Sequence, residues 1–424
     1  MRVDDMVLVS IDDHSIEPPD LFVRHMPAKY RADAPKMVKN AAGRDQWVFQ
    51  GGEVGVAGLA AVVSWPKEEW GLDPVDFSEM RPGCYDIDER VKDMDANGML
   101  AGMNFPTFAG FAGSHLAGTA DTPLTVMALS AYNDWAIDEL AGSHPGRFIP
   151  LGILPMFNLD AAIVEVKRIA AKGCVAVSLP ETPYGVGLPS YASGHFDPLF
   201  AALLDSNITP CLHIAGAFGL IKRPEDTTID DIMLIAPNVM TITAVDIVLS
   251  GLLRKFPNLK FALSEGGIGW VPSFLDRLSR HVVNQSWTHL DQLPPGKTID
   301  EVWREHFLAC FITDPTALNV RHRIGIETIA WECDYPHSDS TWPHSPEVLH
   351  AELEAANCTD DEIDLITWKN VARFFDYDPF AHIPKEEATV GKLRARATAA
   401  GVDASETSKA EYRRRFEARA VATA

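Results

Sequence analysis

The chain has few cysteines, and their spacings are not those of cysteines that crosslink a small domain or bind zinc. Only six occur in 424 residues, and no two of them form a CxxC pair. Several lie inside apolar runs, which is typical of buried free thiols. Disulfide bonds and a zinc knuckle are therefore not expected.

Positive charge is also scarce. Lysine and arginine number 37 against 59 aspartates and glutamates, which gives a formal net charge of -22. Such a chain repels phosphate backbones and anionic membrane surfaces, so nucleic-acid binding is not expected. The N-terminus lacks a basic segment followed by an apolar one, and no uninterrupted apolar run looks long enough to span a bilayer. We expect a cytoplasmic protein.

What the chain does contain is an ordinary globular composition, with 46% hydrophobic and 23% charged residues. Its length would accommodate two or three average domains. Single α/β barrels with insertions also reach this size, so length alone does not require a division.

Short apolar runs recur along the chain, separated by longer segments with helical periodicity. This alternation is typical of repeated βα units and a parallel sheet. Eight runs predict a (β/α)8 barrel, an α/β fold, with strands near residues 6–12, 100–106, 148–154, 174–180, 208–214, 259–265, 307–313 and 328–334.

Two segments depart from the pattern. Residues 17–82 contain several Pro, Gly and Trp residues without a clear βα unit, so we interpret them as an insertion over the barrel mouth. Beyond Pro384 the chain becomes Ala-rich and locally basic, as in Arg413-Arg414-Arg415. This end is either a helical arm packing on a partner subunit or disordered. We therefore divide the chain into a barrel domain, 1–383, and a C-terminal extension, 384–424.

The first and last predicted strands both end in side chains suited to metal. Asp12 and His14 are two residues apart, so they point to the same face of a strand, as two ligands of one ion require. Asp334 closes the last strand and precedes Tyr335-Pro336-His337. Since the carboxyl ends of barrel strands meet at one face, these groups are expected together. The alternative is that Asp12 and Asp334 only cap turns.

His213 and Glu265 end two further predicted strands. His213 is a third candidate ligand, although a lone histidine at such a position is more often a hydrogen-bonded core residue. Glu265 precedes Gly266-Gly267, glycines that let a backbone or substrate approach closely. Its carboxylate is a ligand, a general base, or a salt-bridged structural group.

Neutral imidazoles and carboxylates together suit one divalent ion such as Zn, Mn or Fe. Such an ion lowers the pKa of bound water to about 7 and so supplies a nucleophile near neutral pH. Asp334 would ligate the ion, accept the water's proton, or do both. His337 would orient a ligand or the substrate, or only cap the following turn.

Short motifs follow one another in a fixed order over roughly residues 6–380. They are Asp12-Asp13-His14, Asp93-Met94-Asp95, Asn104-Phe105-Pro106, Tyr132-Asn133-Asp134-Trp135, His144-Pro145-Gly146-Arg147-Phe148, Phe196-Asp197-Pro198-Leu199, His213, Gly266-Gly267 and Asp334-Tyr335-Pro336-His337. In these motifs the chain resembles the amidohydrolase superfamily, in the branch similar to aminocarboxymuconate-semialdehyde decarboxylase.

The resemblance implies a distorted barrel with one catalytic divalent ion held by Asp12, His14, His213 and Asp334. Decarboxylating relatives usually carry a histidine after the sixth strand, where this chain has Glu265.

The resemblance also places Arg277 near an arginine that binds a substrate carboxylate, sometimes across a dimer interface. The alternative is an ordinary surface arginine. Trp342, with Trp47, Trp65 and Trp70, would line an aromatic pocket or serve only in packing.

Three functions follow from these observations. The leading one is a metal-dependent hydrolase that uses a metal-activated water on a small organic substrate, with Asp334 or Glu265 as proton acceptor. The second is a metal-dependent, non-oxidative decarboxylase of an unsaturated or aromatic acid. The third is a catalytically silent barrel that binds a partner. We expect a small-molecule substrate, no nucleic acid or membrane partner, and a homodimer or higher homo-oligomer.

Overall fold

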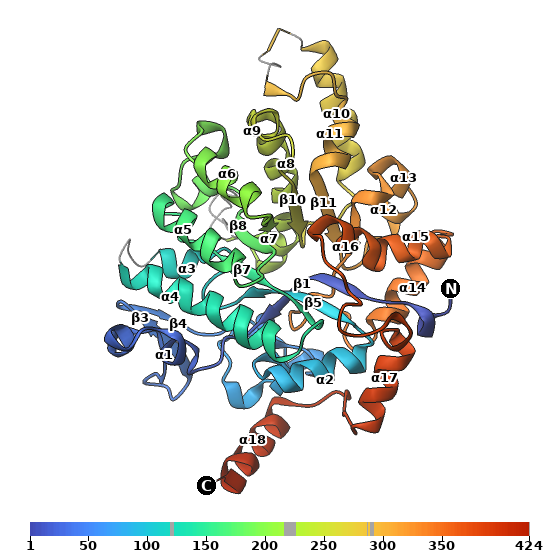
Figure 1. Ribbon diagram of the computed structural model, residues 1–424. Helices are drawn as coiled ribbons and strands as arrows, with labels where there is room; N and C mark the ends of the chain where they lie inside the picture. The colour runs from blue at the N-terminus through green and yellow to red at the C-terminus, as the bar shows by residue number, and fades with distance from the viewer. Residues whose placement is uncertain (119–122, 216–225, 286, 289–291, 424) are drawn as a thin grey trace.

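The structure is a computed structural model that describes residues 1–118, 123–215, 226–285, 287–288 and 292–423. At its centre lies a set of parallel strands surrounded by helices (Figure 1). The predicted α/β fold and all eight strand positions are confirmed. The strands are β1 (Val9–Ser15), β5 (Ala101–Pro106), β6 (Phe148–Ile149) with β7 (Leu151–Ile153), β8 (Ala176–Pro180), β9 (Thr209–His213), β10 (Phe261–Ser264), β11 (Phe307–Phe311) and β12 (Ile329–Trp331).

The barrel is distorted at two places. Strands β1, β5 and β6 form one sheet, and β7 to β12 form a second sheet in sequence order. Pro150 separates β6 from β7, because proline has no N–H to donate to a neighbouring strand. No ladder joins β12 to β1, both of which are fully described. Two backbone hydrogen bonds just beyond β12 join these strands instead, from Asp334 N to Asp12 O at 2.8 Å and from His14 N to Tyr335 O at 2.7 Å.

One hydrophobic cluster takes residues from all eight strand positions and therefore marks the barrel interior. Val9, Met103, Cys211 and Leu308 belong to it. A larger cluster lies between the strands and the helices, as expected for parallel strands covered on both faces. All six cysteines are free and five of them are buried, which confirms the interpretation of their apolar surroundings.

The surrounding helices begin where the sequence supplies capping side chains. Asp86 accepts a hydrogen bond from Glu89 N at the start of α2 (Ile87–Asn97), and Asn158 accepts one from Ala161 N at the start of α5 (Leu159–Ala170). The other helices of the body are α1 (Leu21–His25), α3 (Ser114–Ala117), α4 (Pro123–Asp134), α6 (Asp197–Asp205), α7 (Ile229–Ile235), α8 (Val239–Leu249), α9 (Leu252–Lys255), α10 (Val271–Asn284), α11 (Ile299–His306), α12 (Pro315–Leu318), α13 (Arg321–Ile324), α14 (Ser345–Ala355), α15 (Asp360–Asp364) and α16 (Asn370–Phe375).

The segment between β1 and α2 forms a small structure of its own. It contains an antiparallel sheet of β2 (Lys36–Lys39), β3 (Asp45–Phe49) and β4 (Gly52–Val54), followed by short helical turns. Trp47 of β3 is buried and stacks on Phe108, which follows β5, with ring centroids 4.5 Å apart. This contact places the segment beside the carboxyl end of β5.

The C-terminal segment is helical rather than disordered. Helix α17 (Val390–Ala399) packs against the body through buried Val390 and Leu393, and Val390 N donates to Met6 O at 2.9 Å. Helix α18 (Lys409–Thr423) is anchored by buried Tyr412, while its residues from Arg413 to Arg419 are exposed. In Figure 1, α18 extends away from the rest of the molecule.

The stretch Ile229–Leu249 is strongly apolar, although Asp230, Asp231 and Asp246 interrupt it. By length and composition alone it would suffice to cross a membrane, since an 18-residue window within it has a mean hydropathy of 2.0, and 41% of that window is buried. It consists of α7, a short turn containing Pro237, and α8. Ile229 and Met233 line the cavity described below, which is a physical reason for this apolar composition.

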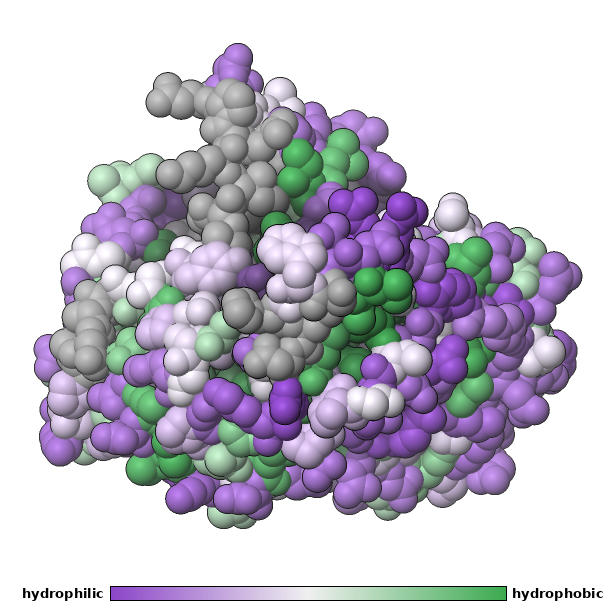
Figure 2. All heavy atoms as spheres, turned by 90° about the horizontal axis from the view of Figure 1, so that it is seen from above, coloured by the Kyte–Doolittle hydropathy of each residue, from purple (hydrophilic) through white to green (hydrophobic). Residues whose placement is uncertain are grey.

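The molecular surface is mostly hydrophilic on the face shown in Figure 2, where hydrophobic residues gather in small separate patches. The most exposed large apolar side chains among the described residues are Trp287, Leu234 and Val283. Scattered apolar residues of this kind are normal for a globular surface.

Candidate metal centre

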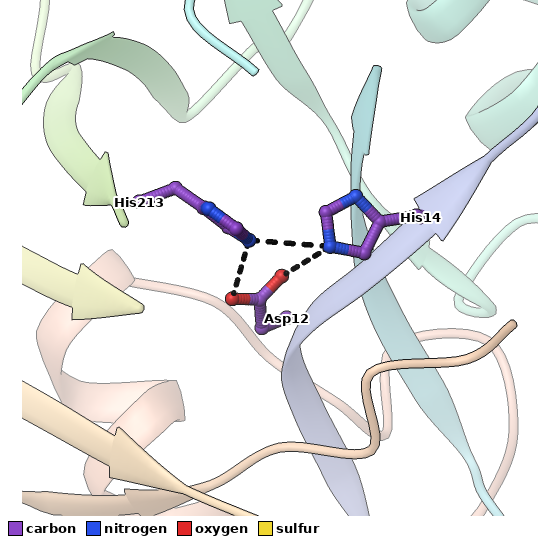
Figure 3. A group of neighbouring side chains, drawn as sticks. All are labelled: Asp12, His14 and His213. Atoms are coloured by element: carbon purple, nitrogen blue, oxygen red, sulfur yellow. Dashed lines mark hydrogen bonds and ion pairs between the residues drawn. The ribbon is translucent and has the colours of Figure 1, made fainter. Parts of the chain in front are cut away.

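Strand β1 brings Asp12 and His14 to one point. The register of β1 against β5 shifts between Ser10 and Asp13, a bulge-like irregularity of the kind that redirects side chains. Both side chains are completely buried, and His14 Nε2 lies 3.5 Å from Asp12 Oδ1 (Figure 3). The two residues therefore present an imidazole and a carboxylate to the same small space.

His213, the last residue of β9, faces the same pair. Its Nε2 lies 3.3 Å from Asp12 Oδ2 and 3.2 Å from His14 Nε2 (Figure 3). On the other side of the ring, Nδ1 lies 2.5 Å from the carbonyl oxygen of Ile214. Because a carbonyl only accepts, Nδ1 carries the hydrogen, and in the neutral ring the lone pair of Nε2 is directed at the cluster.

Asp334 joins the group from just beyond β12. Its Oδ1 lies 3.3 Å from His14 Nε2 and 3.0 Å from His337 Nδ1. The ring of His337 stacks on that of His14, with centroids 3.6 Å apart and planes at 20°. The four proposed ligands are thus gathered from β1, β9 and the end of β12.

Glu265 follows β10 and approaches from the side of His213, with Oε2 3.0 Å from His213 Nε2. A Cβ on the next residue, Gly266, would lie 2.4 Å from Met240 Cγ, so only glycine fits there. The close approach expected of this glycine is therefore with a helix of the protein, α8.

The backbone holds two of these carboxylates in strained positions. Glu265 has φ +56° and Asp334 has φ +55°, a left-handed conformation that costs a non-glycine residue roughly 1 to 2 kcal/mol. Each is held by a hydrogen bond, from Asp334 N to Asp12 O and from Glu265 N to Glu332 Oε2 at 3.1 Å. Such strain persists where the surrounding structure determines the side-chain direction.

The buried oxygens of Asp12 and Asp334 fit a cation. None of the four accepts a hydrogen bond from any described residue, although imidazole nitrogens lie nearby. Buried carboxylates without such partners are costly unless they are paired or coordinate a metal. Ligand atoms of Asp12, His14 and His213, and those of His14, Asp334 and His337, lie within 4.8 Å of one another. This donor set of nitrogen and oxygen suits one divalent transition-metal ion.

Lowered pKa values keep two of the imidazoles in this cluster neutral. Burial lowers the pKa of His14 well below its usual value and that of His337 to about 4, so both rings are neutral at pH 7. Burial raises the pKa of Asp12, and that of Asp334 is raised further by the neighbouring Glu265 and Asp12 carboxylates. Burial alone would lower the pKa of His213, but Asp12 and Glu265 raise it.

Arg90 of α2 connects the two backbone segments that carry His14 and Asp334. Its guanidinium donates to His14 O at 2.9 Å and to Tyr335 O at 3.2 Å, and it lies 3.9 Å from the centre of the Tyr335 ring. It also donates to Asn104 Oδ1 at 2.8 Å. Asp13 Oδ1 accepts from Tyr335 N at 3.1 Å, and burial, opposed by Arg90, raises the pKa of Asp13 to about 7. No sequence motif indicated this role for Arg90.

A second buried pair supports the same loop. Both Asp93 oxygens accept hydrogen bonds of 2.7 Å from Arg81, and Asp93 Oδ2 also accepts from the Tyr335 hydroxyl at 2.6 Å. Trp342 donates to Asp93 O at 3.0 Å and lies under the Arg81 guanidinium. The hydroxyl of Tyr412, on α18, accepts a hydrogen bond from Arg81 Nη1 at 3.3 Å.

A cavity of about 390 Å³ leads to the centre, with Glu265, Asp334 and His337 among its lining residues. Trp47 lines it, but Trp342 and Arg277 are not among the described residues that do so. Trp342 is buried in the packing around Asp93, and Arg277 is exposed on α10. Their predicted substrate-binding roles stay predictions, without support from this geometry.

Sequence reasoning also missed Glu332, which is buried beside Glu265. Its Oε2 accepts the Glu265 N–H and contacts Cys310 Sγ, and burial raises its pKa well above the usual value. The one available signal was a charged residue inside the otherwise apolar run from Ile329 to Cys333.

Glu17, likewise missed, fixes the loop that follows β5. Its carboxylate accepts hydrogen bonds from Phe108 N at 2.8 Å and Ala109 N at 3.0 Å, and Phe108 lines the cavity. The side chain is fully buried, and this burial raises its pKa to about 7 despite the two hydrogen bonds.

A pH dependence of stability follows from Glu17. Between its ordinary pKa of 4.5 and about 7, the folded chain holds a proton that the unfolded chain has lost, so stability falls as pH rises through this window. We expect Glu17→Gln to reduce the loss of unfolding free energy from pH 5 to pH 8 by about 2 to 3 kcal/mol. Urea unfolding of both proteins at the two pH values measures this difference. Identical pH dependences would contradict it.

A parallel barrel whose strand ends gather carboxylates and imidazoles defines a metal-dependent barrel enzyme. The family model described as amidohydrolase matches residues 29–377. The chain belongs to this amidohydrolase family, as its motifs predicted, and the expectation of a single divalent ion is consistent with the donor set.

Solved structures share the fold at low sequence identity. An amidohydrolase from Mycobacterium avium subsp. paratuberculosis K-10 is 20% identical with a TM-score of 0.65, over 87% of this chain and 99% of that one. A 2,6-dihydroxybenzoate decarboxylase from Rhizobium is 18% identical with a TM-score of 0.57, over 88% and 99%. A manganese-bound 5-carboxyvanillate decarboxylase from Novosphingobium aromaticivorans DSM 12444 is 17% identical with a TM-score of 0.57, over 89% and 99%.

Proposed function

We propose that this enzyme is a metal-dependent hydrolase acting on a small organic substrate. Asp12, His14, His213 and Asp334 would hold one divalent ion, and manganese is a reasonable choice because a neighbouring structure contains it. A bound divalent ion supplies Lewis acidity, which lowers the pKa of water and withdraws charge from a carbonyl oxygen.

The observation that carries the proposal is the carboxylate of Glu265, 3.0 Å from His213 Nε2. Decarboxylating members of the branch that the sequence resembles usually have a histidine there, which can donate a proton. A carboxylate can instead accept the proton that a water molecule loses as it attacks.

The remaining roles follow from position. Asp334 contacts His337 Nδ1 and orients that ring, while His337 Nε2 is buried without a partner among the described residues. His337 lines the cavity, and in this proposal its Nε2 would hydrogen bond a substrate or relay a proton to the leaving group.

Replacing Glu265 tests this assignment. We expect Glu265→Gln to lower kcat by about 100-fold to 1,000-fold on a neutral ester, because the proton acceptor is lost, while metal content stays stoichiometric. Steady-state kinetics with elemental analysis measures both quantities. Glu305→Gln, an exposed change on α11, is the control and should leave kcat unchanged. Unaltered kcat in Glu265→Gln would refute the assignment.

Decarboxylation is the second candidate, and the solved structures favour it, since two of those described above are decarboxylases. Release of carbon dioxide without consumption of water would establish it. A silent binding barrel would be indicated by purified protein that holds no stoichiometric metal.

The localisation, the oligomeric state and the division into domains are likewise proposals. We infer a cytoplasmic enzyme that works as a homodimer or higher homo-oligomer, with a barrel domain over residues 1–383 and an extension over 384–424. The insertion, about residues 17–82, would belong to the substrate site, because Trp47 and Leu59 line its cavity.

A further inference from the structure

Glu265 lies between two cavities. It lines the one described above and also a second cavity of about 410 Å³, and among the described residues only Pro237 and Asp339 share this double position. Its Oε2 lies 3.0 Å from Nε2 of the proposed ligand His213. The second cavity therefore approaches the metal centre as closely as the Glu265 carboxylate does, and from another side than the first cavity.

The walls of the two cavities differ in polarity. Away from the ligands the first cavity is mostly apolar, with Leu59 and Met233 in its wall. The second is lined by the loops after β10, β11 and β12, and neither lysine nor arginine is among its eleven described lining residues. Four of those residues are acidic, and they are Glu265, Asp314, Glu332 and Asp339. Burial raises the pKa of Glu332, so the negative charge of this wall comes from the other three.

Such a wall favours a hydrated divalent cation. The carboxylates attract the ion from solution, whereas a hydrocarbon wall would cost it hydration without any return. A separate observation shows that a cation belongs at the end of this path. The completely buried oxygens of Asp12 and Asp334 accept no hydrogen bond from any described residue, which is costly unless they coordinate a metal.

We propose that the second cavity is the route by which the divalent ion reaches its ligands, so that the ion and the substrate enter the centre from different sides. Glu265 is the last side chain on this route, because it lines the second cavity and contacts His213. The proposal rests on the metal centre of the proposed function, but it does not depend on whether the reaction is hydrolysis or decarboxylation.

Charge changes at Thr313 test the route, because Thr313 is exposed and lines the second cavity but not the first. Metal-free protein is mixed with cobalt(II), which takes the same nitrogen and oxygen ligands, and binding is followed by stopped-flow visible absorption. We expect Thr313→Lys to lower the association rate constant by about ten-fold and Thr313→Glu to raise it.

The dissociation rate constant, measured by trapping the released ion with excess chelator, should change in the same direction. A residue on the route alters the barrier for entry and for exit alike, so the Kd should stay within about three-fold of the native value. Added salt should reduce the effects of both Thr313 changes, because it screens the introduced charge.

Met233→Lys and Met233→Glu are the matched controls. They place the same charges in the wall of the first cavity, at a residue that is 39% exposed and so tolerates a long side chain. Both rate constants should change by less than about two-fold. Circular dichroism verifies the fold of each variant, and if Thr313→Lys does not fold, Thr313→Glu decides.

Unchanged rate constants in the Thr313 variants, or larger changes in the Met233 pair, would overturn the route. Native protein that binds cobalt stoichiometrically while the Thr313 variants load normally would sink the route alone and leave the proposed function standing. Native protein that binds no stoichiometric cobalt would sink the metal centre, and with it both the route and the proposed function.

Discussion

We expect Asp334→Asn to lower kcat by about 1,000-fold or more while the barrel remains folded. The change removes an anionic ligand candidate and weakens the contact with His337 Nδ1, yet keeps the size of the side chain. Asparagine also tolerates the left-handed backbone at this position, where φ is +55°. Kinetics, elemental analysis and thermal unfolding followed by circular dichroism measure activity, metal content and fold.

The matched control for this prediction is Asp376→Asn. Asp376 ends α16 with φ +52°, so the same chemical change occurs in the same backbone conformation, but at an exposed position outside the centre. We expect native kinetics from it. Native kinetics from Asp334→Asn as well would show that Asp334 is neither a needed ligand nor the proton acceptor.

The largest loss of stability is expected from Arg90→Met. The change leaves the buried Asp13 without its neighbouring cation and removes donors from His14 O and Tyr335 O. Removal of one partner from such a buried charged network costs about 3 to 5 kcal/mol. Urea unfolding measures this loss, and metal titration by calorimetry should show weaker binding, because His14 and the loop after β12 are no longer held.

Lys92→Met, on the same helix, is the control for Arg90. Lys92 is 46% exposed and pairs with Glu89 at the surface, so its replacement should change the unfolding free energy by about 0.5 kcal/mol or less. A loss below about 1 kcal/mol in Arg90→Met would mean that the buried network contributes little.

The strand positions were accessible from the sequence because each barrel strand is a short apolar run next to turn residues. β11, Phe307–Phe311, is the simplest case, since all five of its residues are buried. β1 was placed a few residues early, near 6–12 rather than Val9–Ser15, because polar residues 12 to 15 continue the strand. The carboxyl-end rule of parallel barrels then brought Asp12, His14, His213 and Asp334 together as candidates.

Other parts of the centre gave weak or no local signals. Arg90 is one of several charges on α2, and only its placement beneath β1 and the loop after β12 brings its guanidinium to His14 O and Tyr335 O. The resemblance suggested a substrate role for Arg277, and the structure places Arg277 on the surface of α10. Trp342 was a candidate for an aromatic pocket or for packing, and it packs beside Asp93.

By itself the sequence determined a parallel barrel of the amidohydrolase family and a set of candidate ligands, because strand periodicity and strand-end chemistry are local properties. Only the tertiary structure decided which buried charges support the ligands, which carboxylates lack partners, and which apolar side chains face the substrate. These depend on contacts between segments far apart in the chain, such as Leu59, Phe111 and Met233 around one cavity. No local pattern specifies such contacts, since each arises only when the helices and loops pack around the strands.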